Sequence, residues 1–366
     1  MPNNKKILVL IPYSFATMEN APKVRAYNMY NALKSVADPI FVIGTPSGLI
    51  NLIRENKSGI PLPKLQSRLI PELEYIIKKQ PIDYVYIESL AASLFSFDYF
   101  FLNCIKKRGI PIFPFIRDLY WKYKGTLQES WRQKIWFKHC DKELAWYQEN
   151  ATGLLFPSQY MANSINFRKK DVLSPAGDPS RCLNPYLPDN ENITFVGGIS
   201  KKMGVEILAN AMKYVVKEYP HSRCNIVGNG DSETIKRLKG LDFINFLPDK
   251  NYFDIPEILA QSYITVIPHP NIPHNDFAIP VKLFDYMSSG RPVVSTDCPS
   301  MTDFIKENDI GIITTDNPKN LAEGIIYLLD NPDVAQKYGN NALCAIKEKH
   351  SWQHRARTLI NIMDDN

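Results

Sequence analysis

The sequence predicts an α/β fold built from two doubly wound parallel sheets. The chain has 366 residues, which suggests two domains at roughly 150 residues each. Short runs of β-branched residues alternate with segments of helical periodicity, as expected for parallel strands connected by helices. The alternation stops in a proline-rich stretch at residues 171–192, which we interpret as a linker, and then resumes. We therefore expect one doubly wound domain on each side of it.

In the first half, five short apolar runs predict strands. They cover residues 7–11, 40–43, 84–87, 112–116 and 152–156. Between them, residues 24–33 and 65–79 have the apolar spacing of amphipathic helices. The run at residues 7–11 follows two lysines and stops at Pro12, so we expect a first strand rather than a signal peptide.

In the second half, the same alternation predicts another five strands. They cover residues 193–196, 225–227, 264–267, 292–295 and 310–313. Apolar residues between Ile207 and Val215 keep one helical face, which predicts a helix there. Asp254 with Glu257 three residues later resembles a capping box at another helix start.

Composition and charge narrow the functional classes. Hydrophobic residues make up 45% of the chain and charged residues 22%, which excludes a disordered protein. The net charge of +5 (43 − 38) is spread along the chain, so no nucleic acid partner is expected, whereas an acidic small molecule or an anionic membrane surface stays open. The six cysteines lie far apart, as expected for reduced thiols in a cytoplasmic protein. The longest apolar stretch, residues 90–105, contains polar residues and predicts no membrane-spanning helix.

A predicted helix of about ten residues beginning at Pro280 carries the strongest functional signal, since proline suits the first helical position and Gly290 the residue past the end. The free N–H groups near Val281 and Lys282, the helix dipole and the lysine charge would form an anion site. Asp285 lies one turn further along the same side and is suited to hold two ribose hydroxyls. The alternative is an ordinary surface helix with a Lys–Asp pair.

The segment Pro280–Val294 resembles the donor-site signature of the retaining nucleotide-sugar glycosyltransferases of family 4, which have the GT-B fold. In that family two acidic residues enclose seven others, and the second binds the ribose. The resemblance gives this role to Asp285. The first position falls at Phe277, which has no carboxylate, so Asp276 is a shifted candidate for the sugar contact.

Two further segments resemble the donor domain of the same family. The segment 195–204 is similar to its glycine-rich first strand and loop. The Arg and Lys that clamp the diphosphate in the family are replaced here by Gly198 and Met203, so the available substitutes are Lys201, Lys202 and Lys282. The alternative for Lys201 and Lys202 is a solvated turn. The segment 226–231 resembles its second strand, and residues 246–256 correspond to the base-binding loop. The resemblance implies a donor-binding set of Gly197, Gly198, Lys202, Gly228, Asn229, Gly230, Asp276, Ile279, Val281, Lys282 and Asp285.

In the first half, Arg117 and Asp118 occupy the place where the family often has a His–Asp pair that faces the sugar. With Lys282 they form the expected catalytic set: Arg117 would steady phosphate or an acidic acceptor, and Asp118 would orient a hydroxyl. The alternative is a salt bridge between these two residues at a strand end.

Other polar residues have two interpretations each. Asn20, Lys23 and Arg25, after the first strand, are placed to approach donor or acceptor, although a solvated helix face explains the two cations equally well. His269 and His274 lie on the loop before the phosphate helix. Lone histidines are more often structural, although this loop is expected to face the cleft.

The resemblance implies a GT-B protein with an acceptor-binding domain at residues 1–180, a nucleotide-sugar donor domain at residues 190–348, and a terminal helix at residues 349–366 that crosses back to the first domain. We expect a cleft between the two domains, where ligands usually bind. The helix would follow the pair Ser351-Trp352.

The expected activity is transfer of a hexose-type sugar from a nucleotide diphosphate donor to a hydroxyl of a glycan or lipid-linked acceptor, with retention. No cofactor or metal is expected, because the chain has no Asp-x-Asp motif. A nucleotide-sugar epimerase of the same fold and a catalytically silent GT-B partner subunit are the alternatives.

Basic and aromatic residues gathered at positions 121–138 suit a peripheral contact with the inner face of an anionic membrane. They are Trp121, Lys122, Lys124, Trp131, Arg132, Lys134, Trp136, Phe137 and Lys138. The alternative is an amphipathic helix whose aromatic residues are buried and whose basic residues face water.

Overall fold

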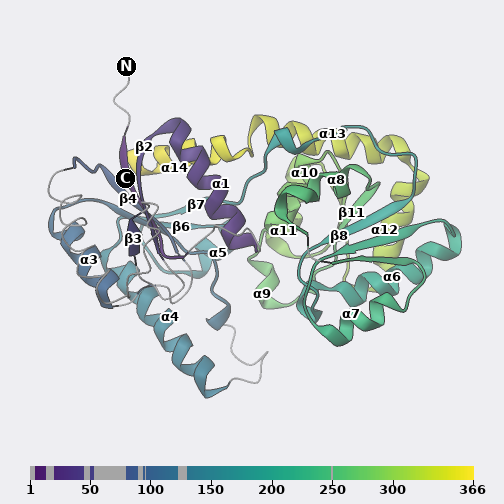
Figure 1. Cartoon of the computed structure of the whole chain (residues 1–366), viewed down its shortest axis with the longest axis horizontal. Helices are drawn as coiled ribbons and strands as arrows, with labels where there is room; N and C mark the ends of the chain where they lie inside the picture. The colour runs from purple at the N-terminus through teal and green to yellow at the C-terminus, as the bar shows by residue number, and fades with distance from the viewer. Residues whose placement is uncertain are drawn as a thin grey trace, which may run out of the picture. The chain divides into compact units, whose positions relative to one another are not determined.

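The computed structural model describes residues 5–13, 20–44, 50–52, 80–89, 94, 96–122, 130–248 and 250–366. The chain divides into two compact units (Figure 1). The first unit contains the described residues up to Ser174 together with Arg355–Asn366. The second unit is Pro175–His354. The predicted helix at residues 65–79 lies outside the described residues.

The first unit has a mostly parallel sheet with the strand order β3-β2-β1-β4-β5-β6-β7. The strands are β1 (Lys6–Ile11), β2 (Asp38–Gly44), β3 (Ile50–Leu52), β4 (Tyr84–Glu88), β5 (Ile112–Phe115), β6 (Leu154–Phe156) and β7 (Lys170–Val172). Only β3 pairs in an antiparallel manner, on β2. The order reverses between β1 and β4, as in other doubly wound sheets.

Helices cover both faces of this sheet. They are α1 (Ala21–Val36), α3 (Ser96–Lys107), α4 (Trp131–Asn150), α5 (Gln159–Ser164) and α14 (Trp352–Asp364). Figure 1 shows α1 and α14 on one face and α3 and α4 on the other. Tyr99 of α3 and Trp146 of α4 pack with ring centroids 5.8 Å apart. None of the described helices combines the length and apolar character that crossing a membrane requires.

The second unit has a six-stranded parallel sheet with the order β10-β9-β8-β11-β12-β13. The strands are β8 (Asn192–Val196), β9 (Arg223–Val227), β10 (Ile244–Leu247), β11 (Ile264–Ile267), β12 (Val293–Thr296) and β13 (Gly311–Thr314). The helices are α6 (Val205–Glu218), α7 (Ser232–Lys239), α8 (Ile255–Ala260), α9 (Pro273–Asp276), α10 (Val281–Ser288), α11 (Pro299–Asn308), α12 (Pro318–Asp330) and α13 (Pro332–Glu348).

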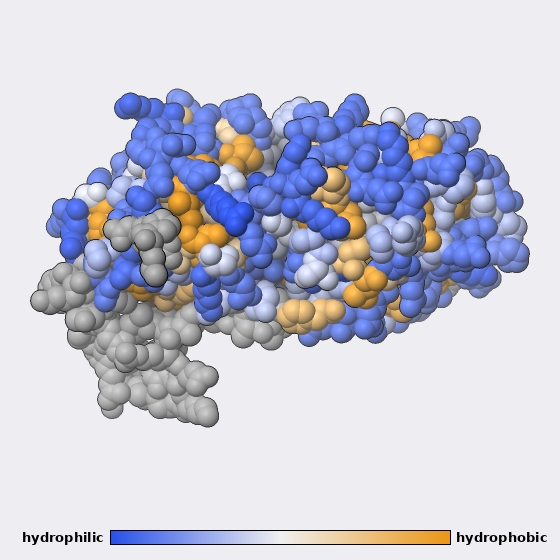
Figure 2. All heavy atoms as spheres, turned by 90° about the horizontal axis from the view of Figure 1, so that it is seen from above, coloured by the Kyte–Doolittle hydropathy of each residue, from blue (hydrophilic) through white to orange (hydrophobic). Residues whose placement is uncertain are grey.

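Alternating side chains place the two cores of the second unit on opposite faces of its sheet. In β11, Ile264 and Val266 pack with α6 and α12, whereas Ile267 packs with α8, α10 and α11. Because side chains alternate between the faces of a strand, a run that is apolar throughout can be buried on both sides. This confirms the predicted α/β class with parallel sheets. On the face shown in Figure 2, apolar residues form separate patches among hydrophilic ones.

The ten predicted strands all exist, but three others were missed. β3, β7 and β10 are short and carry polar residues, so they lack a clear apolar run. The predicted capping box is wrong: the Asp254 side chain makes no capping hydrogen bond, and α8 is entered through a 3₁₀ turn that Asn251 caps.

The segment predicted as a linker is instead built into the two units. β7 joins the first sheet, and the chain from Pro175 onward packs with the second unit. The two compact units divide after Ser174 and again after His354.

Arg291, which is fully buried, fastens this segment. Its guanidinium donates to four main-chain oxygens: those of Leu259 at 2.8 Å, Ala260 at 3.1 Å, Asn184 at 2.9 Å and Tyr186 at 2.8 Å. Burial lowers the Arg291 pKa to about 10. A buried cation is tolerated when its donors are satisfied, so Arg291 acts as a structural clamp.

Replacing Arg291 by methionine should lower the free energy of unfolding by about 3 kcal/mol or more, because each hydrogen bond of a charged group contributes roughly 1.5–3 kcal/mol. Amide hydrogen exchange should also accelerate at residues 184–187. The matched control is Arg223→Met on the exposed start of β9, which should change stability by less than about 0.5 kcal/mol. Equal urea midpoints for Arg291→Met and the unmodified chain would contradict the clamp.

Candidate functional site

The strand order of the second unit defines the place where a ligand is expected. It reverses at β8, which lies between β9 and β11. The carboxyl ends of these strands lead into Gly197, Gly228 and Pro268, which are therefore gathered at one edge of the sheet. In doubly wound sheets, ligands bind outside this edge at the point of reversal.

The loops after β8 and β9 approach each other so closely that only glycine fits. A Cβ atom on Gly228 would lie 2.0 Å from the Gly197 oxygen, and one on Gly230 would lie 2.2 Å from the Ile199 oxygen. Asn229 between them is exposed, and its Oδ1 accepts from the Gly230 N–H at 2.8 Å. Packing of the two loops thus explains Gly228 and Gly230, and their contact with a nucleotide remains a prediction.

Lys282 reaches from α10 to the end of β8. Pro280 is the residue before this helix, not its first residue as predicted, and the helix is eight residues long. The Lys282 Nζ lies 4.2 Å from the centroid of the Phe195 ring. It also lies beside Gly197, where an added Cβ atom would be 2.5 Å from the Nζ. The Nζ is buried and has no hydrogen-bond partner among the described residues. Burial lowers the Lys282 pKa to about 7.

His269, two residues past β11, is the second buried polar side chain at this edge. It is 4% exposed, and its Nε2 has no hydrogen-bond partner in the described part of the chain. Burial holds the His269 pKa well below its usual value, and the nearby Lys282 and His274 act in the same direction. Two hydrogen-bond donors without partners beside the N-terminus of α10 form a suitable site for an anion.

Asp285, one turn further along α10, has partners that the sequence did not suggest. Its Oδ1 lies 3.7 Å from Arg181 Nη2. Arg181 also donates to the main-chain oxygen of Tyr252 at 3.0 Å, and its guanidinium carbon lies 3.7 Å from the centroid of the Tyr252 ring. Burial raises the Asp285 pKa to about 6, against the opposing effects of Arg181 and of a hydrogen bond with Tyr252. Asp285 is therefore a largely buried carboxylate and not half of an exposed Lys–Asp pair.

The other predicted donor residues lie in different surroundings. Lys201 and Lys202 are exposed on a 3₁₀ turn, and Gly198 is exposed, so the solvated-turn alternative describes the two lysines. Ile279 packs against the core, and Val281 is the first residue of α10. Asp276 is the last residue of α9, and its buried Oδ1 has no partner among the described residues. Burial is the main cause that raises the Asp276 pKa, and the nearby Asp297 raises it further.

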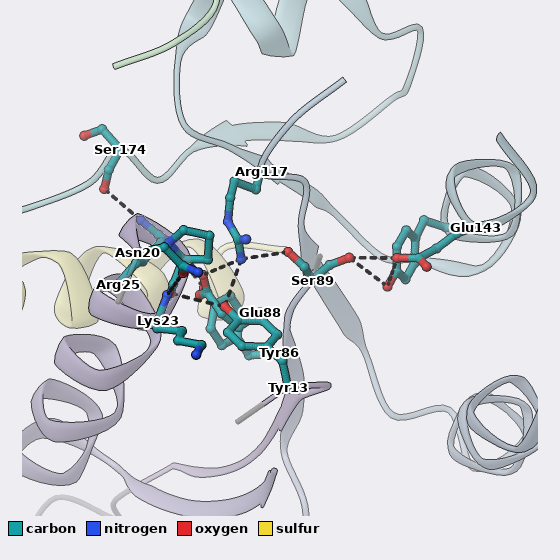
Figure 3. Close-up of polar contacts among 12 residues, drawn as sticks. Tyr13, Asn20, Lys23, Arg25, Tyr86, Glu88, Ser89, Arg117, Glu143 and Ser174 are labelled. Carbon is teal, nitrogen blue, oxygen red and sulfur yellow. Dashed lines mark hydrogen bonds and ion pairs between the residues drawn. The ribbon is translucent and has the colours of Figure 1, made fainter. Parts of the chain in front are cut away.

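In the first unit, a buried polar network lies at the corresponding edge, where β1 and β4 are neighbours (Figure 3). Arg25 is 2% exposed, so the solvated-face alternative for it is wrong. Its Nε donates to Glu88 Oε1 at 2.8 Å, and Tyr86 also donates to Glu88. Arg25 further donates to the Ser174 oxygen at 3.3 Å. The side chain of Asn20 caps α1 by accepting from the Lys23 N–H.

Arg117 is part of the same network but keeps unused donors. Its Nη2 donates to Tyr13 Oη at 2.8 Å and to the Ser89 oxygen at 3.1 Å, as Figure 3 shows, whereas its Nε and Nη1 have no partner among the described residues. The predicted alternative of a salt bridge with Asp118 is wrong, because Arg117 forms its ion pair with Glu88, at 3.9 Å. Asp118 accepts from the Leu119 N–H at 2.7 Å. Arg117 and Asp118 both line a hollow together with Glu143.

No group of three or more His, Cys, Asp or Glu residues within the described ranges is arranged to hold a metal ion. In the second unit, Lys282 and His269 are suited to hold a phosphate, because their buried nitrogens have no partner among the described residues. Sequence reasoning identified the lysine from its place in the helix. For His269 it left two interpretations, and the signal for binding was that its loop was expected to face the cleft.

Comparison with known proteins agrees with this picture. Residues 190–331 match the family model described as glycosyl transferases group 1. Spore coat protein SA of Bacillus subtilis is 25% identical over 189 residues, which are 48% of this chain and 48% of that protein. The phosphatidyl-myo-inositol mannosyltransferase of Mycobacterium leprae is 24% identical over 248 residues, which are 66% of this chain and 62% of that protein. The chain spans about half the length of the first curated relatives that it matches.

The similarity of the fold extends over the whole chain. The solved structure of HepE from Anabaena in complex with UDP and glucose matches with a TM-score of 0.69 and 14% identity, covering 99% of this chain and 100% of that one. The two α/β units with their doubly wound sheets thus have the fold of the GT-B glycosyltransferases.

The buried Lys282 predicts a specific dependence of stability on pH. The lysine pKa is about 7 in the folded protein and 10.5 in its ordinary state, so the unfolded chain binds more protons between these values and stability rises with pH. Between pH 7 and 9 the unmodified protein should gain about 2 kcal/mol relative to Lys282→Met. Urea unfolding of both proteins at several pH values measures this difference, and parallel curves would show that Lys282 is not desolvated.

Proposed function

We propose that this chain is a metal-independent glycosyltransferase that moves a hexose-type sugar from a nucleoside diphosphate donor to a hydroxyl of a glycan or lipid-linked acceptor, with retention. The observation that carries the proposal is the buried Lys282 Nζ, which has no partner among the described residues and lies next to Gly197 at the point of strand reversal. A diphosphate would supply the negative charge that this site lacks. The match of residues 190–331 to a glycosyltransferase family supports the same assignment.

In the proposed reaction, the bond between the sugar C1 and the diphosphate oxygen breaks, and a bond from C1 to the acceptor oxygen forms. The acceptor proton passes to an oxygen of the leaving diphosphate on the same face of the sugar. Lys282 and the N–H groups at the start of α10 stabilise the charge that develops on the leaving group, which is usually the largest electrostatic contribution to such catalysis. We assign the acceptor to the first unit, where Arg117 has donors to spare and Asp118 orients a hydroxyl.

The donor site can be tested by a thermal-shift screen of UDP-, GDP- and TDP-sugars, which includes UDP because UDP is bound in the HepE structure. A donor at 100 times its dissociation constant should stabilise the protein by about 2.7 kcal/mol. Lys282→Met should abolish the shift, since it removes the positive charge that would balance the diphosphate. Lys217→Met, on the exposed side of α6, is the matched control and should keep it. No shift with any of the donors would refute the proposed site.

The same measurement tests the proposed ribose contact of Asp285. Ribose nucleotides should shift the unmodified protein more than 2′-deoxyribose nucleotides do, and Asp285→Asn should lose most of this difference. A variant that still discriminates fully would show that Asp285 serves only its pair with Arg181.

A catalytically silent partner subunit is the second candidate. Two positions favour it, because Gly198 offers no side chain and Met203 packs against the core where the resembling family has a cationic clamp. Transfer or slow hydrolysis of a bound nucleotide sugar by the purified chain distinguishes the enzyme from the silent subunit.

We further propose that the N-terminal half of α4 contacts the inner, cytoplasmic face of an anionic membrane. Trp131 is 67% and Ile135 49% exposed, and they lie one turn apart on the helix. Arg132, Lys134 and Lys138 are exposed beside them. Trp121 and Phe137 are buried and so cannot contribute, which corrects the predicted cluster. Lys124 lies outside the described residues.

Sedimentation with vesicles tests this contact. The protein should bind anionic vesicles more strongly than neutral ones, and added salt should weaken binding because it screens the basic residues. The double variant Trp131→Ser with Ile135→Ser should bind less, whereas Tyr214→Ser, which removes an exposed aromatic residue of the second unit, should bind as before. Binding that ignores lipid charge and salt would contradict the proposal.

A further inference from the structure

We propose that His269 is the second member of the diphosphate clamp and that its Nε2–H donates a hydrogen bond to a diphosphate oxygen whose charge Lys282 balances. The inference rests on the proposed donor site and adds a binding residue to it. It assigns a ligand-binding role to a histidine for which the sequence left a structural role and a place facing the cleft as the two interpretations.

The main chain on both sides of His269 is held in place. A Cβ atom on Gly204, the residue before α6, would lie 1.6 Å from the Pro268 oxygen, so the start of α6 packs directly on this segment. From the other side, Thr296 donates to the His269 oxygen, and Cys298 Sγ lies 3.8 Å from it. The main chain that carries the imidazole is therefore held by β12 and the start of α6.

The imidazole itself lacks the contacts that a structural histidine makes. Buried polar atoms are nearly always hydrogen-bonded, because leaving them unpaired costs stability. His269 is 4% exposed, yet its Nε2 has no partner in the part of the chain that the structure describes. A bound group that accepts a hydrogen bond would remove this cost.

The charge around His269 identifies that group. The titratable groups that act on its ring are Lys282 and His274, and neither is an acid. Burial, with Lys282 acting in the same direction, lowers the pKa of the ring, so the ring is neutral and offers a single N–H. A bound diphosphate would favour the charged form of Lys282. One cation with one neutral donor at the start of a helix suits a diphosphate.

This arrangement also accounts for the missing clamp. Gly198 and Met203, where the resembling family has cations, offer no donor side chain, and Lys201 and Lys202 are exposed. In this chain the donors come from the end of β11 and the start of α10 instead. Both lie at the edge where the strand order reverses.

Titration calorimetry with inorganic pyrophosphate tests the inference without knowledge of the base, and UDP serves as a second probe. His269→Leu should weaken the binding of both by about tenfold or more, the factor for one hydrogen bond to a charged group. His269→Gln, which keeps an N–H donor, should recover most of the affinity. His221→Leu, at an exposed histidine elsewhere in the unit, should bind as the unmodified protein does.

The melting temperature of the ligand-free variants separates binding from structure. His269→Leu should melt at the same temperature or higher, because it removes a buried polar atom without a partner. Unchanged pyrophosphate affinity in this variant would overturn the inference, and so would a marked loss of stability together with no recovery in His269→Gln. Absence of pyrophosphate and UDP binding by the unmodified protein would refute the donor site as well. Binding that depends on His269 without any sugar transfer would refute only the proposed activity.

Discussion

The close approach of main-chain segments at the carboxyl edge of the second sheet is the constraint on which the candidate site depends. The loops after β8 and β9 touch at Gly228, and the start of α6 touches the end of β11 at Gly204. A Cβ atom at Gly204, Gly228 or Gly230 would collide with main chain, so these positions contribute no side chain to the edge. Polar groups therefore enter from α10 and from the residues after β11, which brings Lys282 and His269 close together.

Arg291 and Lys282 of the second unit both bear the free-energy cost of removing a basic group from water, but they differ in how that cost is compensated. Arg291 donates to four main-chain oxygens, so its burial is compensated within the fold. The Lys282 Nζ is equally inaccessible but has no partner among the described residues. An uncompensated charge lowers stability unless a ligand completes it, and such groups concentrate at functional sites. The contrast in hydrogen bonding separates the structural cation from the binding one.

The first unit contains a similar contrast between two arginines, Arg25 and Arg117. Arg25 and Glu88 form a buried ion pair in which Tyr86 also donates to the carboxylate, and the Arg25 guanidinium lies 3.7 Å from the centroid of the Phe115 ring. Arg117 lies 3.9 Å from the same carboxylate, and among the described residues only its Nη2 has hydrogen-bond partners. Glu88 is thus already balanced by Arg25, and the remaining donors of Arg117 are fixed in direction by Tyr13 and Ser89. A guanidinium held in this way is prepared for a polar ligand.

The sequence by itself determined the α/β class, ten strands and the helix that carries Lys282 and Asp285, because these features depend on local periodicity and on the signals at helix ends. It could not reveal the partners of these residues. Asp285 meets Arg181 from a segment that the sequence described as a linker, and Arg25 meets Glu88 across 63 positions of the chain. Whether His269 and Lys282 are paired or left without partners depends on which distant main chain packs beside them. Burial and pairing are properties of the tertiary structure, and they decided which of the predicted residues are exposed, which are structural and which remain available to a ligand.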